Sequence, residues 1–190
     1  PTVGGWGACK GHDGQVGLFC VGDGETYNVP VEMAETRYGI RVDEHSLHTD
    51  GAGAGEYRGG SGAVRVYRSM NENQTFTASF GRNKWPVWGA AGGKDGSVNY
   101  FQFIDADGTV SEPMGIAARR VMNTNDVVRM VTATGGGYGN PFKRPAEKVA
   151  MDVKNEYITV EQAKADYGVL VDPETFKVLG LTEERQKAEK

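Results

Sequence analysis

The sequence predicts a mainly β (α+β) fold, in which a glycine-rich antiparallel β domain is followed by two short C-terminal helices. Between residues 15 and 131, short apolar or alternating runs are separated by Gly, Asn and Asp, which is typical of strands joined by tight turns. The 190-residue chain also contains 28 glycines. After Pro141 the composition changes to Glu, Lys, Ala and Val at helical spacing. We therefore divide the chain into a glycine-rich β domain at 1–141 and a short helical segment at 142–190 that packs on it.

The β domain is expected to contain strands at several apolar runs, namely 16–21, 63–67, 75–80, 99–104 and 126–131. The Asp-Ala-Asp-Gly sequence at 105–108 predicts a hairpin turn, with Gly108 providing the positive φ that such turns need. Residues 31–37 are rich in helix formers and follow Pro30, which is favoured in a first helical turn. One short helix is therefore predicted within the β domain.

Two further helices are predicted at 145–154 and 160–167. In the first, Val149 and Val153 lie four residues apart on one face. In the second, Thr159 and Gln162 have the spacing of a capping box, and Gly168 is placed to end the helix. The charged tail from residue 181 onward is expected to fray as a solvated surface segment.

Composition excludes several classes of protein. A formal net charge of −4, without clusters of Lys and Arg, argues against nucleic acid or anionic membrane as a partner. No run approaches the roughly 20 apolar residues of a membrane span, and no signal-peptide pattern is visible. Cys9 and Cys20 make neither a disulfide framework nor a Cys-x-x-Cys motif. We expect a cytoplasmic protein with reduced thiols, and the abrupt start at Pro1 leads us to expect a fragment, a processed chain or a trimmed one.

The Thr-Gly-Gly-Gly-Tyr-Gly-Asn-Pro segment at 134–141 is a candidate phosphate loop, because successive N–H groups in glycine turns can surround an anion. A Walker loop would end in Gly-Lys-Ser/Thr, whereas this segment ends in Asn140 and Pro141, and a Rossmann loop would open into a long helix. We therefore interpret the segment as a structural turn and do not expect this chain itself to bind ATP.

Histidine and tryptophan side chains give no catalytic signature. His12, His45 and His48 do not form a metal motif such as His-Glu-x-x-His, so no metal site is predicted, and we expect His45 and His48 to flank a strand. The chain has no Gly-x-Ser-x-Gly motif, and no histidine is adjacent in sequence to either cysteine. The tryptophans are expected to be core or interface anchors, and they are Trp6, Trp85 and Trp88.

The glycine-rich stretch at 48–60 is the strongest candidate for chemistry. A positioned Asp50 can act as a base, and Arg58 can hold a carboxylate or phosphate bidentately. The structural alternative is an ion pair between Asp50 and Arg58 that braces the loop. We name Asp50, Arg58 and His48 as candidate catalytic residues.

Seven groups of motifs occur in order over nearly the whole chain. They are Gly-Gly-Trp-Gly-Ala at 4–8 with Gly-His-Asp-Gly at 11–14; Asn-Val-Pro-Val-Glu at 28–32 with Glu-Thr-Arg-Tyr at 35–38; Asp-Gly-Ala-Gly-Ala-Gly at 50–55 with Tyr-Arg-Gly-Gly at 57–60; Trp-Gly-Ala-Ala-Gly-Gly at 88–93; Asp-Val-Val at 126–128 with Thr-Gly-Gly-Gly-Tyr-Gly at 134–139; Pro-Ala-Glu-Lys-Val at 145–149; and Asp-Val at 152–153 with Tyr-Gly-Val at 167–169. In content and order the set resembles the carboxyl-terminal part of the hydantoinase B/oxoprolinase family.

The resemblance implies a B-type subunit of an ATP-dependent assembly, beside a hydantoinase A-type partner of actin-like ATPase fold. Members hydrolyse cyclic amides such as N-methylhydantoin, 5-oxoproline or lactams after phosphoryl activation. It also implies that ATP and Mg bind at the partner subunit, and that a divalent metal belongs to the amino-terminal part of the longer B-type subunit, with none bound by this chain alone. Within the second pair of motifs, Asn28, Glu32 and Arg37 are the expected substrate-binding residues.

Three alternatives remain open. The Cys-Val-Gly-Asp-Gly-Glu-Thr-Tyr sequence at 20–27 departs from the Met-Thr-Asn-Thr of the amidohydrolase members, which keeps the related acetone and acetophenone carboxylases open. The missing nucleophile and metal signature keep a noncatalytic scaffold segment open. A stand-alone carbohydrate-binding protein rests only on aromatics among glycine turns.

Overall fold

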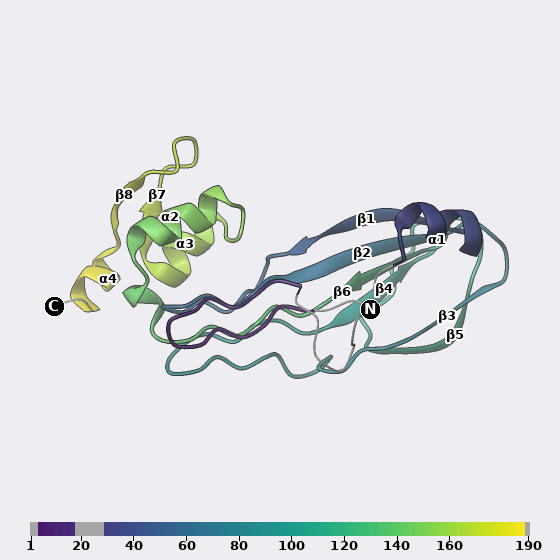
Figure 1. Cartoon of the computed structure of the whole chain (residues 1–190), viewed down its shortest axis with the longest axis horizontal. Helices are drawn as coiled ribbons and strands as arrows, with labels where there is room; N and C mark the ends of the chain where they lie inside the picture. The colour runs from purple at the N-terminus through teal and green to yellow at the C-terminus, as the bar shows by residue number, and fades with distance from the viewer. Residues whose placement is uncertain (1–3, 18–28, 189–190) are drawn as a thin grey trace.

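The structure is a computed structural model that describes residues 4–17 and 29–188. It confirms a mainly β fold, with antiparallel sheets and short helices. Figure 1 shows an elongated molecule with a β sheet at one end, a small module built from the C-terminal residues at the other, and long extended segments between them. Within the described residues, no helix is long and apolar enough to cross a membrane.

The main sheet has the strand order β1-β2-β6-β4, with every neighbouring pair antiparallel. Its strands are β1 (Ile40–His48), β2 (Gly62–Ser69), β6 (Val127–Val131) and β4 (Tyr100–Ile104). A two-stranded ribbon of β3 (Gln74–Ser79) and β5 (Ile116–Met122) packs on one face. Because side chains alternate across a strand, the sheet buries an aromatic cluster beneath the ribbon, including Phe101 and Phe103, and a valine cluster that includes Val64 and Val131.

Four predicted strands are confirmed, as β2, β3, β4 and β6. The strand expected at His45 and His48 is β1, which contains both histidines, and β5 was not anticipated. The strand predicted at 16–21 extends into 18–28, which lies outside the described residues. The predicted turn at 105–108 is present: Gly108 has φ +88° and its N–H donates to the carbonyl of Asp105 at 2.8 Å. The predicted helix is α1 (Val31–Tyr38), which ends at Gly39 in the left-handed conformation.

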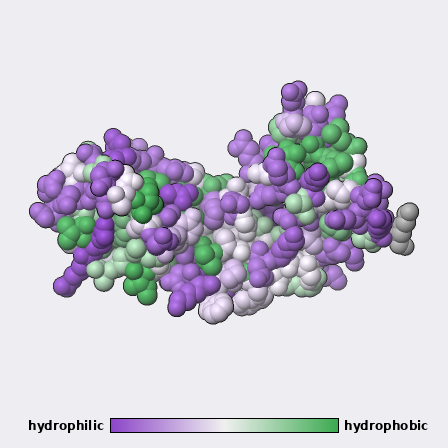
Figure 2. Space-filling model, turned by 180° about the vertical axis from the view of Figure 1, so that it is seen from behind, coloured by the Kyte–Doolittle hydropathy of each residue, from purple (hydrophilic) through white to green (hydrophobic). Residues whose placement is uncertain are grey.

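Extended glycine-rich segments connect the sheet to the C-terminal module. The segments at 4–14, 53–60, 89–96 and 133–139, here called the glycine bundle, run side by side (Figure 1) and exchange backbone hydrogen bonds such as Gly60 N–H to the carbonyl of Trp6 at 2.9 Å. A Cβ added at Gly59 would lie 1.9 Å from the carbonyl oxygen of Gly135. Side chains are therefore excluded where these backbones meet, and Figure 2 shows a pale surface of intermediate hydropathy between two more strongly coloured ends.

The interpretation of 134–141 as a turn was wrong, because residues 133–139 form an extended segment that contacts the other three segments of the bundle. Backbone N–H groups along it donate to neighbouring carbonyls, including Gly135 to Gly60 at 2.8 Å and Gly137 to Lys94 at 2.9 Å. The glycines of this segment therefore serve close packing of backbone.

The C-terminal module begins with the 3-10 turn η2 (Pro141–Lys143), followed by α2 (Ala146–Lys154) and α3 (Val160–Tyr167). Both predicted helices are confirmed. The capping box is formed, with Gln162 N–H donating to Thr159 Oγ1 at 3.1 Å and Thr159 N–H donating to Gln162 Oε1 at 2.8 Å, and Gly168 ends α3 at φ +63°. The module's apolar core also includes Ala54 of the glycine bundle.

The structure adds a hairpin of β7 (Val169–Val171) and β8 (Val178–Leu181) and a last helix, α4 (Glu183–Ala188), none of which was anticipated. The expectation that the charged tail frays was wrong. Arg185 is 4% exposed and donates to the carbonyl oxygens of Tyr167 at 2.9 Å and Arg144 at 2.8 Å. A residue that looks like a solvated charge in the sequence therefore anchors the helix.

Candidate functional site

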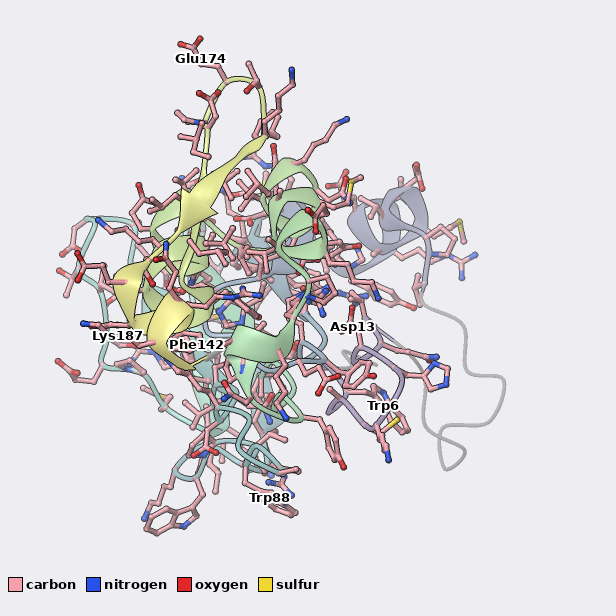
Figure 3. The ribbon with its side chains drawn as sticks, turned by 90° about the vertical axis from the view of Figure 1, so that its left-hand side faces the viewer. Trp6, Asp13, Trp88, Phe142, Glu174 and Lys187 are labelled. Carbon is pink, nitrogen blue, oxygen red and sulfur yellow. The ribbon has the colours of Figure 1, made fainter. Side chains whose placement is uncertain are left out.

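A buried ion network lies where the glycine bundle meets the C-terminal module, and Figure 3 labels one of its members, Asp13. Arg144, just after η2, donates to both carboxylate oxygens of Asp13 at 2.7 and 2.8 Å, and its Nε donates to Asp152 at 2.9 Å. The Nε of Arg58 lies 3.6 Å from Asp152, and its guanidinium lies 4.3 Å from the centre of the Tyr157 ring. Ion pairs between arginine and aspartate thus connect residues that are far apart in sequence.

Burial and ion pairing shift the titration of this network in opposite directions. Burial raises the pKa of Asp152, and the guanidinium groups of Arg144 and Arg58 offset only part of that rise. Burial would also raise the pKa of Asp13, but hydrogen bonds from Arg144 and from the Arg58 backbone outweigh it and lower the pKa. Burial raises the pKa of Tyr167 as well. The hydroxyl of Tyr167 and the Nε of Arg58 are buried without a hydrogen-bond partner, so the network is incompletely satisfied.

The three candidate catalytic residues do not contact one another. Arg58 is 5% exposed and faces Asp152, so the alternative of an Asp50–Arg58 pair was wrong. Asp50 is exposed and accepts a hydrogen bond from Gln162 Nε2 at 3.3 Å. His48 ends β1, and its Nδ1 lies 2.9 Å from the carbonyl oxygen of Thr132. Arg58 therefore belongs to the ion network, whereas Asp50 and His48 remain near the surface.

The histidines lie elsewhere than expected. His45 and His48 are both within β1 and do not flank a strand. The Nε2 of His45 accepts a hydrogen bond from Arg65 Nε at 3.3 Å, and burial, followed by the charge of Arg65, lowers the pKa of His45. Among residues 4–17 and 29–188, no group of three or more His, Cys, Asp or Glu side chains is arranged to hold a metal ion.

An apolar groove of about 650 Å³ lies between α1 and the strands β1, β2 and β3. The helix faces it with Val31, Ala34 and Tyr38, which are three and four residues apart, while Phe76 and Val128 line the side of the sheet and ribbon. The volume falls in the range of about 300–1,000 Å³ that is common for ligand pockets. Sequence reasoning missed this groove, because it exists only once helix, sheet and ribbon have assembled.

Two of the three expected substrate-binding residues, Glu32 and Arg37, lie on α1 but do not line this groove. Glu32 and Arg37 are exposed residues of α1, in its first and last turns. Asn28 lies outside the described residues, as does the 20–27 segment that kept the carboxylases open. The helix thus presents Glu32 and Arg37 to solvent, whereas Val31, Ala34 and Tyr38 line the groove.

The tryptophans are not core residues. Trp6 is 45% exposed, Trp85 is 75% exposed and Trp88 is 67% exposed. The guanidinium of Arg82 stacks over the Trp88 ring at 4.8 Å from its centre. Of the two roles expected for these side chains, the core role was wrong.

Comparison with known proteins gives a consistent result. The family model described as hydantoinase B/oxoprolinase matches residues 1–141. The chain is 31% identical to the B-type subunit of a putative D-/L-hydantoinase from Pseudomonas sp. (strain NS671), covering 87% of this chain and 28% of that protein. It is 30% identical to the beta subunit of the caprolactamase from Pseudomonas jessenii, covering 90% of this chain and 30% of that one.

Two solved structures have the same fold. The ATP-dependent caprolactamase from Pseudomonas jessenii superimposes with a TM-score of 0.76 at 30% identity, over 98% of this chain and 32% of that one. A nucleotide-free acetone carboxylase superimposes with a TM-score of 0.75 over 97% of this chain and 29% of that one, and at 18% identity it shows the fold alone. The chain spans about a third of the length of these relatives. By sequence and by fold, the chain belongs to the hydantoinase B/oxoprolinase family.

Proposed function

We propose that this chain is part of a B-type subunit of a cytoplasmic, ATP-dependent multi-subunit enzyme. The enzyme hydrolyses a cyclic amide, namely a hydantoin, 5-oxoproline or a lactam, after phosphoryl activation by a hydantoinase A-type partner. The observation that carries the proposal is the 30% identity to an ATP-dependent caprolactamase over 98% of the chain. The similarity to the B-type polypeptide of a putative hydantoinase supports the same reaction class.

The proposal places ATP and Mg at the partner subunit, and any divalent metal in another part of the B-type subunit. One feature of this chain supports placing ATP elsewhere. The N–H groups of Gly135, Gly137 and Gly139 donate to carbonyl oxygens of the protein, so they are not directed at a phosphate. In this proposal the chain contributes groups that bind and position the substrate and that move protons.

His48 and Asp50 are the residues that we propose for proton transfer. The Nδ1 of His48 must carry a hydrogen to donate to the carbonyl of Thr132, which leaves Nε2 of the neutral ring as the proton acceptor. The exposed carboxylate of Asp50 is a second acceptor. We assign Arg58 a positioning role, since it is buried against Asp152. The proposed substrate contacts remain Asn28, Glu32 and Arg37.

Reconstitution of the complete B-type subunit with its A-type partner tests the reaction. We expect ADP release coupled to ring opening of a hydantoin, 5-oxoproline or caprolactam, measured by chromatography and mass spectrometry. Ring opening that proceeds without ATP, or without the segment described here, would refute the proposal. The ketone carboxylase alternative, which shares the fold, predicts instead that turnover requires bicarbonate and acetone or acetophenone.

Substitution of His48 or Asp50 by Ala separates a catalytic segment from a noncatalytic scaffold. If either residue transfers a proton, turnover falls by about 10²–10⁴-fold while the complex still assembles. Asp107→Ala, in the exposed hairpin turn, is the matched control and should leave turnover unchanged. Unchanged turnover in both site variants would favour the scaffold.

A further inference from the structure

Asp50, which we propose as a proton acceptor, lies at the corner of a tight turn, here called the Asp50 turn (residues 49–52). The N–H of Ala52 donates to the carbonyl of Thr49 at 3.3 Å, so the four residues form a β-turn with Asp50 in the second position. Gly51 occupies the third position with φ +75°, where glycine is favoured. Exposed turns are mobile unless other parts of the chain hold them, so the position of the carboxylate depends on contacts outside the turn.

Thr134 holds the backbone of the Asp50 turn from inside the protein. Its hydroxyl donates to the carbonyl of Gly51 at 2.7 Å, although the two residues are 83 positions apart in sequence. The Thr134 side chain is completely buried. A hydroxyl has a single hydrogen, and this short contact uses it. The carbonyl next to Asp50 is therefore tied to the interior of the glycine bundle.

Ser97 keeps the Thr134 hydroxyl in that orientation. The N–H of Ser97 donates to Thr134 Oγ1 at 2.9 Å, and the N–H of Thr134 donates to Ser97 Oγ at 3.0 Å. The hydroxyl thus accepts one backbone hydrogen bond and donates another, which leaves it little freedom to turn. In the Thr-Gly-Gly-Gly-Tyr-Gly motif at 134–139, the glycines serve close packing of backbone, whereas the threonine provides this hydroxyl.

Gln162 contacts the Asp50 carboxylate itself. Its Nε2 donates to Asp50 Oδ1 at 3.3 Å, and its Oε1 accepts from the N–H of Thr159 at 2.8 Å within the capping box. The amide group is therefore held at the start of α3 by one atom and meets the carboxylate with the other. The Asp50 turn is thus held at its backbone by the glycine bundle and at its side chain by the C-terminal module.

We propose that Thr134 is a positioning residue for the proton-transfer step, with Gln162 as a second one. Thr134 fixes the backbone that carries Asp50, and Gln162 fixes the direction of the carboxylate, without either side chain contacting substrate. A displacement of about 1 Å in a reacting group can lower turnover by about 10²-fold, so the loss of such a contact is measurable in kcat. The inference rests on the proposed function, which supplies the reaction, and it adds the residues that keep the acceptor in place.

The test measures ATP-dependent ring opening by the complete B-type subunit with its A-type partner. Thr134→Val removes only the hydroxyl function, and kcat should fall by about 10- to 100-fold with KM unchanged, because Thr134 does not contact substrate. Thr134→Ser keeps the hydroxyl and should retain the wild-type kcat. Ser111→Ala is the matched control and should leave kcat unchanged. The Ser111 hydroxyl likewise accepts from one backbone N–H, that of Phe103 at 2.9 Å, and donates to one carbonyl, that of Glu112 at 3.1 Å.

A double variant separates positioning from general damage to the fold. With Asp50→Ala in place there is no carboxylate to position, so the addition of Thr134→Val should cause no further fall in kcat. Gln162→Met is compared with Thr159→Ala, since each removes one half of the capping box but only Gln162→Met removes the donor to Asp50. Gln162→Met should therefore lower kcat by on the order of 10-fold relative to Thr159→Ala.

The outcomes separate this inference from the proposed function. If the wild-type complex shows no ATP-dependent ring opening, both are overturned. If the wild type is active and Asp50→Ala turns over equally well, the inference is overturned while the proposed reaction stands. The same conclusion follows if Thr134→Val behaves like wild type, if its full effect persists in the Asp50→Ala background, or if Ser111→Ala loses as much activity. If Thr134→Val unfolds, the comparison of Gln162→Met with Thr159→Ala carries the decision, and equal turnover of these two variants overturns the inference.

Discussion

The buried ion network yields the sharpest prediction about stability, through the substitution Asp152→Asn. The Asp152 side chain is 9% exposed and accepts from Arg144 Nε at 2.9 Å and from Arg144 Nη2 at 2.8 Å, while Arg58 Nε lies 3.6 Å away. Removing its charge leaves Arg58 and Arg144, each at most 5% exposed, with Asp13 as the remaining carboxylate of the network. Uncompensated positive charge would then remain buried.

Loss of one partner from a buried ion pair costs about 3–5 kcal/mol of unfolding free energy. We expect a value near 3 kcal/mol, at the low end of that range, because burial already raises the pKa of Asp152 and so disfavours the charge that is removed. For a domain of this size, each kcal/mol lowers the Tm by about 2–4 °C, so the Tm should fall by roughly 6–12 °C.

Urea denaturation of the purified chain, followed by circular dichroism, measures the effect. Asp166→Asn is the matched control: it also removes one carboxylate, but its pair with Lys94 has side chains 31% and 54% exposed, so the cost should be about 0–1 kcal/mol. A second variant, Arg144→Met with Asp152→Leu, should cost less than Asp152→Asn alone, because the two charged residues that remain in the network, Arg58 and Asp13, have opposite charges. If Asp152→Asn cost no more than the surface control, the role assigned to the network would be refuted.

Three further predictions follow from other parts of the fold. The pKa of Asp13 is lower in the folded chain than its unfolded value of 3.8, so the stabilisation by Asp13 is complete above pH 3.8 and is lost as the pH falls through the folded pKa. Asp13→Asn should therefore weaken the dependence of unfolding free energy on pH below about pH 4. An unchanged pH dependence in that range would contradict this. Gly135→Ala would place a Cβ 1.9 Å from the carbonyl oxygen of Trp6 and should destabilise the chain by about 1–3 kcal/mol or more. Gly81→Ala is the control, because a Cβ there has no atom within 4 Å, and it should leave the Tm nearly unchanged. Equal effects of the two variants would argue against close packing of the glycine bundle. Thr159→Ala removes the side-chain acceptor of the capping box and should cost about 1 kcal/mol in thermal unfolding, with Thr159→Ser retaining most of the stability.

Features that depend on neighbours in sequence were predictable. The capping box of α3 needs only Thr159 and Gln162, three residues apart, and its end needs only Gly168. The turn at 105–108 likewise follows from Gly108 and its positive φ. Strands with strong apolar alternation, such as β2, were also found, because the period of two is visible along the chain itself.

Two strands, β1 and β5, have weak sequence patterns. Most residues of β1 and β5 are exposed, and their side chains include several charges, so no apolar alternation marks them. They form because β2 and β3 offer them backbone partners, with Ile40 paired to Ser69 and Gln74 paired to Met122. Hydrogen bonding to a neighbouring strand, and not the side-chain pattern, therefore determines where these two strands form.

Family, fold class and the helices α2 and α3 were determined by the sequence, since motif order, turn residues and helix caps are local properties of the chain. The role of the glycines and the place of each charge were decided only by the tertiary structure. Gly59 is needed because Gly135 approaches it closely, and Arg58 meets Asp152 across 94 residues of sequence. Sequence spacing records neither close backbone approach nor burial, because both arise only when distant segments pack together.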